Sequence, residues 1–324
     1  MTRNFEKSIS EISEFKLTNS CPDSLAWNSD LNLLAVGGYN LDDAKNQTKS
    51  GEVYFLDENL KVVRCFYEVG AIFDVKWDGD VLYGCNTIGQ IIKIENIVKE
   101  PKIDTFSVAD EDTTLTHINI DSANRKLAAT SNKGDLFYTD LETKTNVSTA
   151  KVSTKMMDTY YETWCCTFFD NNTIFTGSDD SICRRTDVRV SDASSKYLES
   201  DKFCERSAGI CFIQPAENSE NQIILGGYDS HVCVFDVRNS SNPVLDFELP
   251  DDGGAWRLLE DKVNNGYVVA GMYSGLHWFD SEAELVKSYE KYKTGIIYGV
   301  EEISSTGEIV YCSFYEKTVG KLKF

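Results

Sequence analysis

One pattern recurs along the chain at a spacing of about 45 residues, and it limits the possible folds more than any other feature. Residues 174–189 and 223–238 each contain an apolar run, a short polar turn, a second apolar run and a closing Asp. Looser copies occur before, between and after these two. The acidic residues that close the copies are separated by 38 to 49 residues, and they are Asp57, Glu95, Asp140, Asp187, Asp236 and Asp280. The chain of 324 residues is therefore interpreted as an array of one repeated unit instead of two unrelated domains.

This period is typical of a WD-type propeller blade, which contains four short antiparallel strands. Seven units fit in the chain, and a further short apolar run precedes each of them as a candidate innermost strand. Amphipathic stretches of helical period are absent. The sequence predicts an all-β, seven-bladed WD40-type β-propeller, formed as a single domain by residues 1–324. A strand at about residues 10–18 is expected to complete the last blade, because the chain ends after the third strand of that blade.

Charge and cysteine content narrow the classes of partner and compartment. The formal net charge of −20 repels phosphate backbones and anionic lipids, so we expect neither nucleic acid nor membrane as a partner. No apolar run approaches the ~20 residues of a membrane span, and residues 1–20 lack the apolar segment of a signal peptide. The ten cysteines are scattered without C-x-x-C spacing, which indicates free thiols in the cytoplasm and no bound metal. We expect a monomer that needs no cofactor.

Large aromatic residues recur at one position of the predicted inner strands, near the mouth of the central channel. When these strands are aligned, the first position holds Phe73, Trp164, Trp256 and Tyr298, and the second holds Asp74, His117, Cys165 and Arg257. Aromatic side chains are favoured in strands, so packing between neighbouring blades is one explanation. The other is a partial cage that binds a quaternary ammonium group through the ring faces. Asp74 would then contribute negative charge to a substrate-binding mouth.

Three further segments are expected at the same face, and one of them is the turn at residues 313–315. Gly253 and Gly254 precede an inner strand and permit either a tight turn or a close approach to a ligand. Arg257 carries a planar guanidinium suited to a carboxylate or carbonyl oxygen, unless it is only a solvated side chain. The turn that contains Asp229 and His231 supplies a candidate general base, although such a His is more commonly a hydrogen-bond donor in the turn.

The other histidines and the hydrolase motifs give weaker indications. His117 lies in a repeat that aligns poorly, and His277 is expected to pack inside a third strand. Three histidines without close spacing argue against a catalytic metal. There is no G-x-S-x-G elbow, P-loop or H-E-x-x-H motif. The residues alone therefore predict an acidic propeller with one candidate binding face.

Four strings in the second half resemble a known family. They are residues 228–239, 253–258, 297–300 and 312–315. Similar Y-D-x-H-x-x-x-W-D-x-R, G-G-x-W-R-[LI], Y-G-x-[DE] and S-F-Y strings occur in the same order in the diphthine methyl ester hydrolase family, the WD-repeat proteins of diphthamide biosynthesis. The resemblance covers about residues 160–320. Phe235 replaces the usual Trp, and residues 259–262 replace a K-W-H-P-like tail.

The resemblance implies hydrolysis of the methyl ester of methylated diphthine on translation elongation factor 2, which yields diphthine. The substrate side chain carries a trimethylammonium group beside the ester. Under this hypothesis the aromatic mouth binds the cation through Trp164, Trp256 and Tyr298, and Arg257 polarises the carbonyl. Tyr315 is a further substrate-binding residue. His231, assisted by Asp229, would activate water, and Cys165 is an alternative nucleophile. Two other functions remain open: a non-catalytic scaffold for protein interactions, and a reader of methylated ammonium groups.

Overall fold

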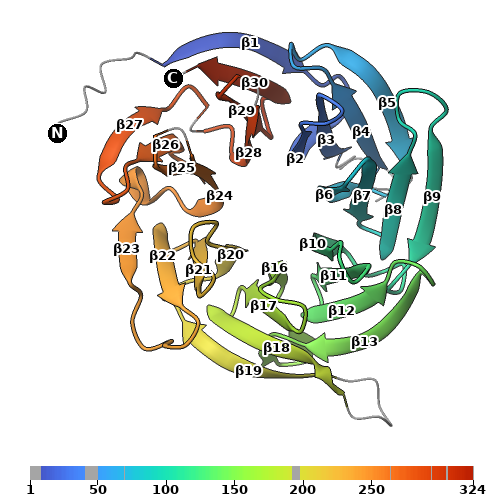
Figure 1. The fold of residues 1–324 in the computed structure, drawn as a ribbon, viewed down its shortest axis with the longest axis vertical. Helices are drawn as coiled ribbons and strands as arrows, with labels where there is room; N and C mark the ends of the chain where they lie inside the picture. The colour runs from blue at the N-terminus through green and yellow to red at the C-terminus, as the bar shows by residue number, and fades with distance from the viewer. Residues whose placement is uncertain are drawn as a thin grey trace.

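The computed structural model contains seven four-stranded antiparallel sheets arranged around a central channel, as Figure 1 shows. It describes residues 9–40, 50–68, 70–191, 198–262, 264–292, 294–303 and 306–323. The predicted seven-bladed all-β propeller is therefore confirmed. No helix of the described residues is long and apolar enough to cross a bilayer.

The innermost strand of every blade lines the channel. These strands are β2 (Cys21–Asn28), β6 (Ile72–Asp78), β10 (Leu115–Asp121), β16 (Thr163–Phe168), β20 (Ile210–Pro215), β24 (Ala255–Asp261) and β28 (Ile297–Ile303). The second strands are β3 (Leu33–Asn40), β7 (Val81–Asn86), β11 (Lys126–Ser131), β17 (Thr173–Ser178), β21 (Gln222–Gly227), β25 (Gly266–Gly271) and β29 (Glu308–Ser313). Second strands are largely buried, because each blade face packs on a neighbouring blade.

The two outer strands complete each sheet. Third strands are β4 (Ser50–Leu56), β8 (Gln90–Glu95), β12 (Asp135–Asp140), β18 (Ile182–Ser191), β22 (His231–Asp236), β26 (Gly275–Phe279) and β30 (Thr318–Lys323). Outermost strands are β5 (Val62–Glu68), β9 (Lys102–Ser107), β13 (Thr145–Lys151), β19 (Leu198–Glu205), β23 (Leu245–Glu248), β27 (Leu285–Tyr289) and β1 (Ser10–Lys16). A small hairpin, β14 (Lys155–Met156) and β15 (Thr159–Tyr160), and a 3-10 helix, Pro250–Asp252, lie in connections.

The last blade combines the two ends of the chain. Its outermost strand is β1, which pairs antiparallel with β30, so that Glu14 lies opposite Gly320. Figure 1 shows the blue N-terminal strand beside the red C-terminal one. The Glu14 carboxylate accepts hydrogen bonds from Lys291 Nζ at 2.7 Å and from Tyr292 Oη at 2.6 Å. The ring of blades is thus closed by side chains as well as by the strand ladder.

The hydrophobic core is divided among the contacts between adjacent blades. One cluster joins Phe55 of β4 to Ile72 and Val75 of β6, the next blade's inner strand. Another joins Leu25 of β2 to Val310 of β29 in the last blade. Each blade can bury its apolar faces only against its neighbours, so closure of the ring is needed to complete the core.

Candidate functional site

Every inner strand has a β-bulge close to the end of the channel where that strand begins. In all seven blades the register with the second strand shifts by one residue at this point. A bulge turns the extra side chain away from the regular alternation, and bulges are common beside functional sites. The seven bulged residues are Asp23, Phe73, Thr116, Trp164, Cys211, Trp256 and Tyr298. The positions inferred for Phe73, Trp164, Trp256 and Tyr298 are therefore structurally equivalent.

Aromatic rings at this end of the channel form a continuous cluster, here called the aromatic layer. Trp256 lies at its centre, with ring centroids 4.7 Å from Tyr298, 5.9 Å from Trp164 and 6.4 Å from Tyr228. Tyr298 contacts Phe314 at 5.4 Å, and Phe314 in turn contacts Tyr315 at 5.2 Å and Tyr39 at 5.0 Å. Phe73 stacks on Tyr39 at 5.0 Å. Segments from six blades thus contribute to one aromatic surface.

The aromatic layer has a buried interior and an exposed rim. Trp256 is 8% exposed, whereas Tyr315 is 66% exposed. Trp164 is half-buried, and its Nε1 donates a hydrogen bond to Asp179 Oδ1 at 2.5 Å. The four aromatic residues expected at the mouth lie in one connected cluster, which confirms that they pack between blades. Binding of a quaternary ammonium group by these rings stays a prediction.

Arg257 follows Trp256 in β24 and connects the aromatic layer to the interior of the channel. Its guanidinium lies over the Trp256 ring, with Cζ 5.4 Å from the centroid. Nη1 donates hydrogen bonds to the carbonyl oxygens of Trp256, at 2.9 Å, and Cys211, at 3.2 Å. Nη2 and Nε have no acceptor among the described residues. The side chain is fixed through one nitrogen, and other donors remain for a ligand.

A cavity of about 320 Å³ occupies the channel beside Arg257. It extends along the inner strands as far as Glu217, which follows the end of β20. Its ionisable lining includes Asp74, Lys76, His117, Arg257 and Glu301. Burial raises the pKa of Glu301 to about 7, although the nearby Lys76 opposes this shift. The cavity therefore offers charged groups of both signs to a polar ligand.

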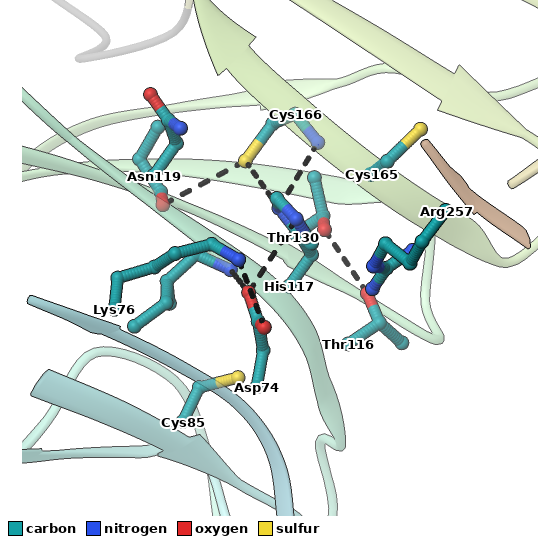
Figure 2. Close-up of polar contacts among 12 residues, drawn as sticks. Asp74, Lys76, Cys85, Thr116, His117, Asn119, Thr130, Cys165, Cys166 and Arg257 are labelled. Carbon is teal, nitrogen blue, oxygen red and sulfur yellow. Dashed lines mark hydrogen bonds and ion pairs between the residues drawn. The ribbon is translucent and has the colours of Figure 1, made fainter. Parts of the chain in front are cut away.

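Asp74 and His117 form a chain of contacts across three blades. Figure 2 shows the His117 ring between Asp74 and Cys166. His117 Nε2 lies 3.4 Å from Asp74 Oδ2, and its Nδ1 lies 3.4 Å from the backbone nitrogen of Cys166. Asp74 also accepts bonds from the Ile118 backbone N–H and from Lys76 Nζ, each at 3.2 Å.

Both members of this pair are committed to structural contacts. Burial lowers the pKa of His117 to about 3, so the ring is neutral, Nε2 donates to Asp74 and Nδ1 accepts from Cys166. Burial disfavours the ionised form of Asp74, but Lys76, His117 and Arg257 together hold its pKa below the ordinary value. The substrate-binding role expected for Asp74 is therefore not supported, because its oxygen atoms already have three donors.

Cys165 is wrongly placed for the role of nucleophile. Its side chain is completely buried, and its Sγ faces the carbonyl oxygens of Gly177 and Ile210. Burial raises the pKa of this thiol to about 12. A thiol attacks as the thiolate, which is absent here at neutral pH.

His231 and Asp229 do not form the expected catalytic pair. The His231 Nδ1 atom lies 2.8 Å from Asp246 Oδ1 of the outermost strand β23, and His231 itself begins β22, the third strand from the channel. Asp229 instead forms an ion pair with Arg206 at 3.0 Å. In the turn that contains these residues, Tyr228 contacts the aromatic layer. The His231 ring is instead directed to the outer edge of the blade.

Three other predicted residues have structural explanations. A Cβ atom on Gly253 would lie 1.8 Å from Ser274 Oγ, and Gly254 has a φ of +64° that favours glycine. The Gly254 N–H donates to Ser230 Oγ at 3.0 Å. These contacts place Trp256 and Arg257, and the glycines need not contact a ligand. His277, expected to pack internally, is buried and bonds to Ser274 and Ser288 at 2.8 Å each.

Sequence reasoning missed Asp23, Tyr39, Phe314 and Glu301. Asp23 immediately precedes Ser24 of β2, just as Trp256 immediately precedes Arg257 of β24. Extending the inner-strand alignment by one position into the first repeat would have identified it. Tyr39 and Phe314 lie at or just after the ends of second strands, where no periodic signal distinguishes them.

Comparison with known proteins found relatives but no matching family model. Mouse and human proteins named diphthine methyltransferase are 30% identical over 119 and 118 residues, which is 36% of this chain. These alignments cover 24% and 25% of the relatives. A Dictyostelium discoideum protein named diphthine methyltransferase homolog is 27% identical over 48% of each chain. The matches thus span between a quarter and about half of the relatives' length. They confirm the resemblance found in the sequence: the chain is similar to proteins named diphthine methyltransferase.

Proposed function

We propose that the protein acts in diphthamide biosynthesis and hydrolyses the methyl ester of methylated diphthine on translation elongation factor 2, which yields diphthine. The names of its relatives support a methyl-modifying enzyme that acts on diphthine. Hydrolysis of the ester goes beyond these names, which describe methyl transfer. We place the reaction in the cytoplasm, and the ten free cysteines support a reducing compartment.

The observation that carries the proposal is the contact between Trp256 and Arg257. The substrate has a trimethylammonium group beside its ester, so its site needs an apolar cation-binding surface directly beside a hydrogen-bond donor. Trp256 belongs to the aromatic layer, and the guanidinium of the next residue lies 5.4 Å from its ring centroid. These two neighbouring groups match the two neighbouring parts of the substrate.

The proposed roles follow from this geometry. Trp164, Trp256 and Tyr298 contact the cation, and the exposed Tyr315 lies at the rim where the protein substrate enters. The free donors of Arg257 bind the carbonyl oxygen as it becomes negatively charged. Water adds to the carbonyl carbon, the bond to the methoxy group breaks, and methanol, a carboxylate and one proton are released. The net charge of −20 favours a cationic partner surface.

The test incubates the purified full chain with the methylated intermediate of the elongation factor and follows its mass. Hydrolysis removes the mass of one CH2 group, methyl transfer to an unmethylated substrate adds it, and a scaffold changes neither. Arg257→Ala is expected to lower kcat by about 10² to 10³, as for loss of an oxyanion donor. Arg257→Lys should recover only part of the lost kcat, since an ammonium group lacks the planar pair of N–H donors of a guanidinium.

His231→Ala is the comparison variant. The His231 ring bonds to Asp246 on the outer edge of its blade, so we expect this change to leave kcat within a factor of about two. Loss of turnover in His231→Ala, or full turnover in Arg257→Ala, would contradict the assignment of roles. No mass change with the wild-type protein would reject hydrolysis itself.

The aromatic layer also favours a second candidate, a reader that binds methylated ammonium groups without chemistry. Such a protein would bind trimethyl-lysine peptides and leave every ester intact. Fluorescence of Trp164 and Trp256 during titration with these peptides, run beside the mass assay, distinguishes the two.

A further inference from the structure

Asp23 is the one carboxylate in the ring of seven bulged residues around the channel. It lies on β2, and the neighbouring positions in the ring hold Tyr298 of the last blade and Phe73 of the second. It therefore occupies a position that aromatic residues hold in four other blades. An acid in this position has no evident role in packing.

The Asp23 side chain is buried without a hydrogen-bonding partner. It is 6% exposed, and no group of the described residues donates a hydrogen bond to its carboxylate. By contrast, Asp74, which is also buried, has three donors. A buried carboxyl group without a donor is costly to ionise and rare in folded proteins. Burial raises the pKa of Asp23 to about 8; Arg257 opposes this shift and Asp74 adds to it.

The surroundings of Asp23 combine aromatic rings with few charges. The ionisable groups that interact with it come from its own blade, from β6 and β24, and from the last blade: Cys21, Tyr39, Asp74, Arg257, Tyr298 and Cys312. Burial and the Asp23 charge both raise the pKa values of Tyr39 and Tyr298, so these phenols stay neutral. No ion pair joins Asp23 to Arg257 among the described residues, so its charge is not neutralised by direct contact.

We propose that Asp23 is the anionic wall of a site for a quaternary ammonium group, and that the cation binds together with ionisation of Asp23. A quaternary ammonium ion has charge but no N–H, so it requires a negative group that is not already occupied by donors. Aromatic faces supply the rest of the contact. This inference deepens the proposed function and rests on its cation-binding half alone, because it does not require ester hydrolysis.

Linkage between the proton and the cation gives a quantitative expectation. A bound cation favours the ionised form of Asp23, so binding below pH 8 releases a proton. The affinity for the cation should therefore increase as the pH is raised toward pH 8, by up to about tenfold per pH unit, and stay constant above pH 8. A site built from aromatic rings alone would show no such dependence.

The experiment titrates the full chain with tetramethylammonium chloride between pH 6 and pH 9. Fluorescence of Trp164 and Trp256 reports occupancy, and calorimetry in two buffers with different heats of ionisation counts the protons released. The wild-type protein should release about one proton at pH 7 and lose this release above pH 8. Asp23→Asn should bind more weakly at pH 8.5, with no pH dependence.

Two variants serve as controls. Asp30→Asn removes an equal charge from an exposed residue of the same blade, and it should keep the wild-type profile. Glu301 also titrates near neutral pH. If Asp23 causes the pH dependence of the affinity, Glu301→Gln must show the same dependence as the wild-type protein. The proton count on the wild-type protein needs no variant and remains decisive should a substitution impair folding.

Binding without proton release in the wild-type protein would overturn the inference. The inference would also be overturned if the affinity of Asp23→Asn changed with pH as in the wild-type protein, or if the affinity of Glu301→Gln no longer changed with pH. Absence of tetramethylammonium binding would overturn both this inference and the proposed cation contact. The mass assay judges hydrolysis separately: a protein that hydrolyses the ester without pH-linked cation binding retains the proposed function and refutes the role of Asp23.

Discussion

At the scale of single residues, the candidate site depends on two neighbouring groups, an aromatic ring and a guanidinium. Trp256 and Arg257 follow one another in β24, and the bulge at Trp256 interrupts the regular alternation of side chains. The guanidinium of Arg257 therefore lies over the ring of Trp256. Asp23 reaches the same region from another blade. A buried acid held without a donor lowers stability, which is typical of residues retained for function.

Replacement of Asp23 should therefore stabilise the protein. Its pKa is raised in the folded state, so between about pH 4 and pH 8 the unfolded chain holds fewer protons than the folded one. The free energy of unfolding then falls as the pH rises, by up to about 1.4 kcal/mol per pH unit, and the loss is complete above pH 8. Asp23→Asn avoids this loss. Urea unfolding of both proteins at pH 5 and pH 8 measures it, and we expect the advantage of the variant to be larger at pH 8.

An equal difference between the two proteins at both pH values would mean that Asp23 titrates normally. Asp30→Asn again supplies the control for net charge, because it removes an equal charge from an exposed side chain of the same blade.

At the scale of the strands, one bulge repeated seven times positions the site. The repeat places the second residue after each strand start, such as Asp74, His117 or Arg257, against the channel. Different blades use this position differently: Arg257 keeps free donors, whereas Asp74 and His117 bond to each other. Strand geometry therefore creates the positions, and the contacts between blades decide which side chains remain available for a ligand.

The link from Asp74 to His117 should contribute strongly to stability. Asp74→Ala would leave the Ile118 N–H, the His117 Nε2–H and the Lys76 ammonium without their acceptor. Removal of one partner from a buried charged network costs about 3–5 kcal/mol. Urea unfolding of Asp74→Ala should show this loss. Asp112→Ala removes an acid from an exposed surface pair with Lys133 and should leave the free energy of unfolding almost unchanged. Similar losses in the two variants would contradict a structural role for Asp74.

At the scale of the whole molecule, the circular arrangement creates both the core and the site. Segments as distant as Tyr39 and Phe314 contact each other at 5.0 Å only because the last blade packs on the first. Closure also pairs β1 with β30, which leaves that edge of the sheet covered.

Deletion of residues 1–17 should open this edge. The truncated chain loses the β1–β30 ladder and the contacts of Glu14 with Lys291 and Tyr292. An unpaired strand invites association between molecules, so we expect a lower Tm and larger species in size-exclusion chromatography. Glu14→Gln keeps the strand and should remain monodisperse. A truncated protein with unchanged Tm and size would show that β1 is not needed for closure.

The sequence by itself determined the architecture and part of the site. Alternation of apolar and polar residues, with turn residues at a regular period, is local information, and it was enough to predict seven four-stranded blades and the equivalence of Trp164, Trp256 and Tyr298. Only the tertiary structure decided which side chains remain available. The partner of His231 lies fifteen positions away on an outer strand, that of Asp74 lies in the next blade, and Asp23 has no donor in the part of the chain that the structure describes. Such contacts depend on which residues meet when the ring closes, and no pattern within one repeat encodes them.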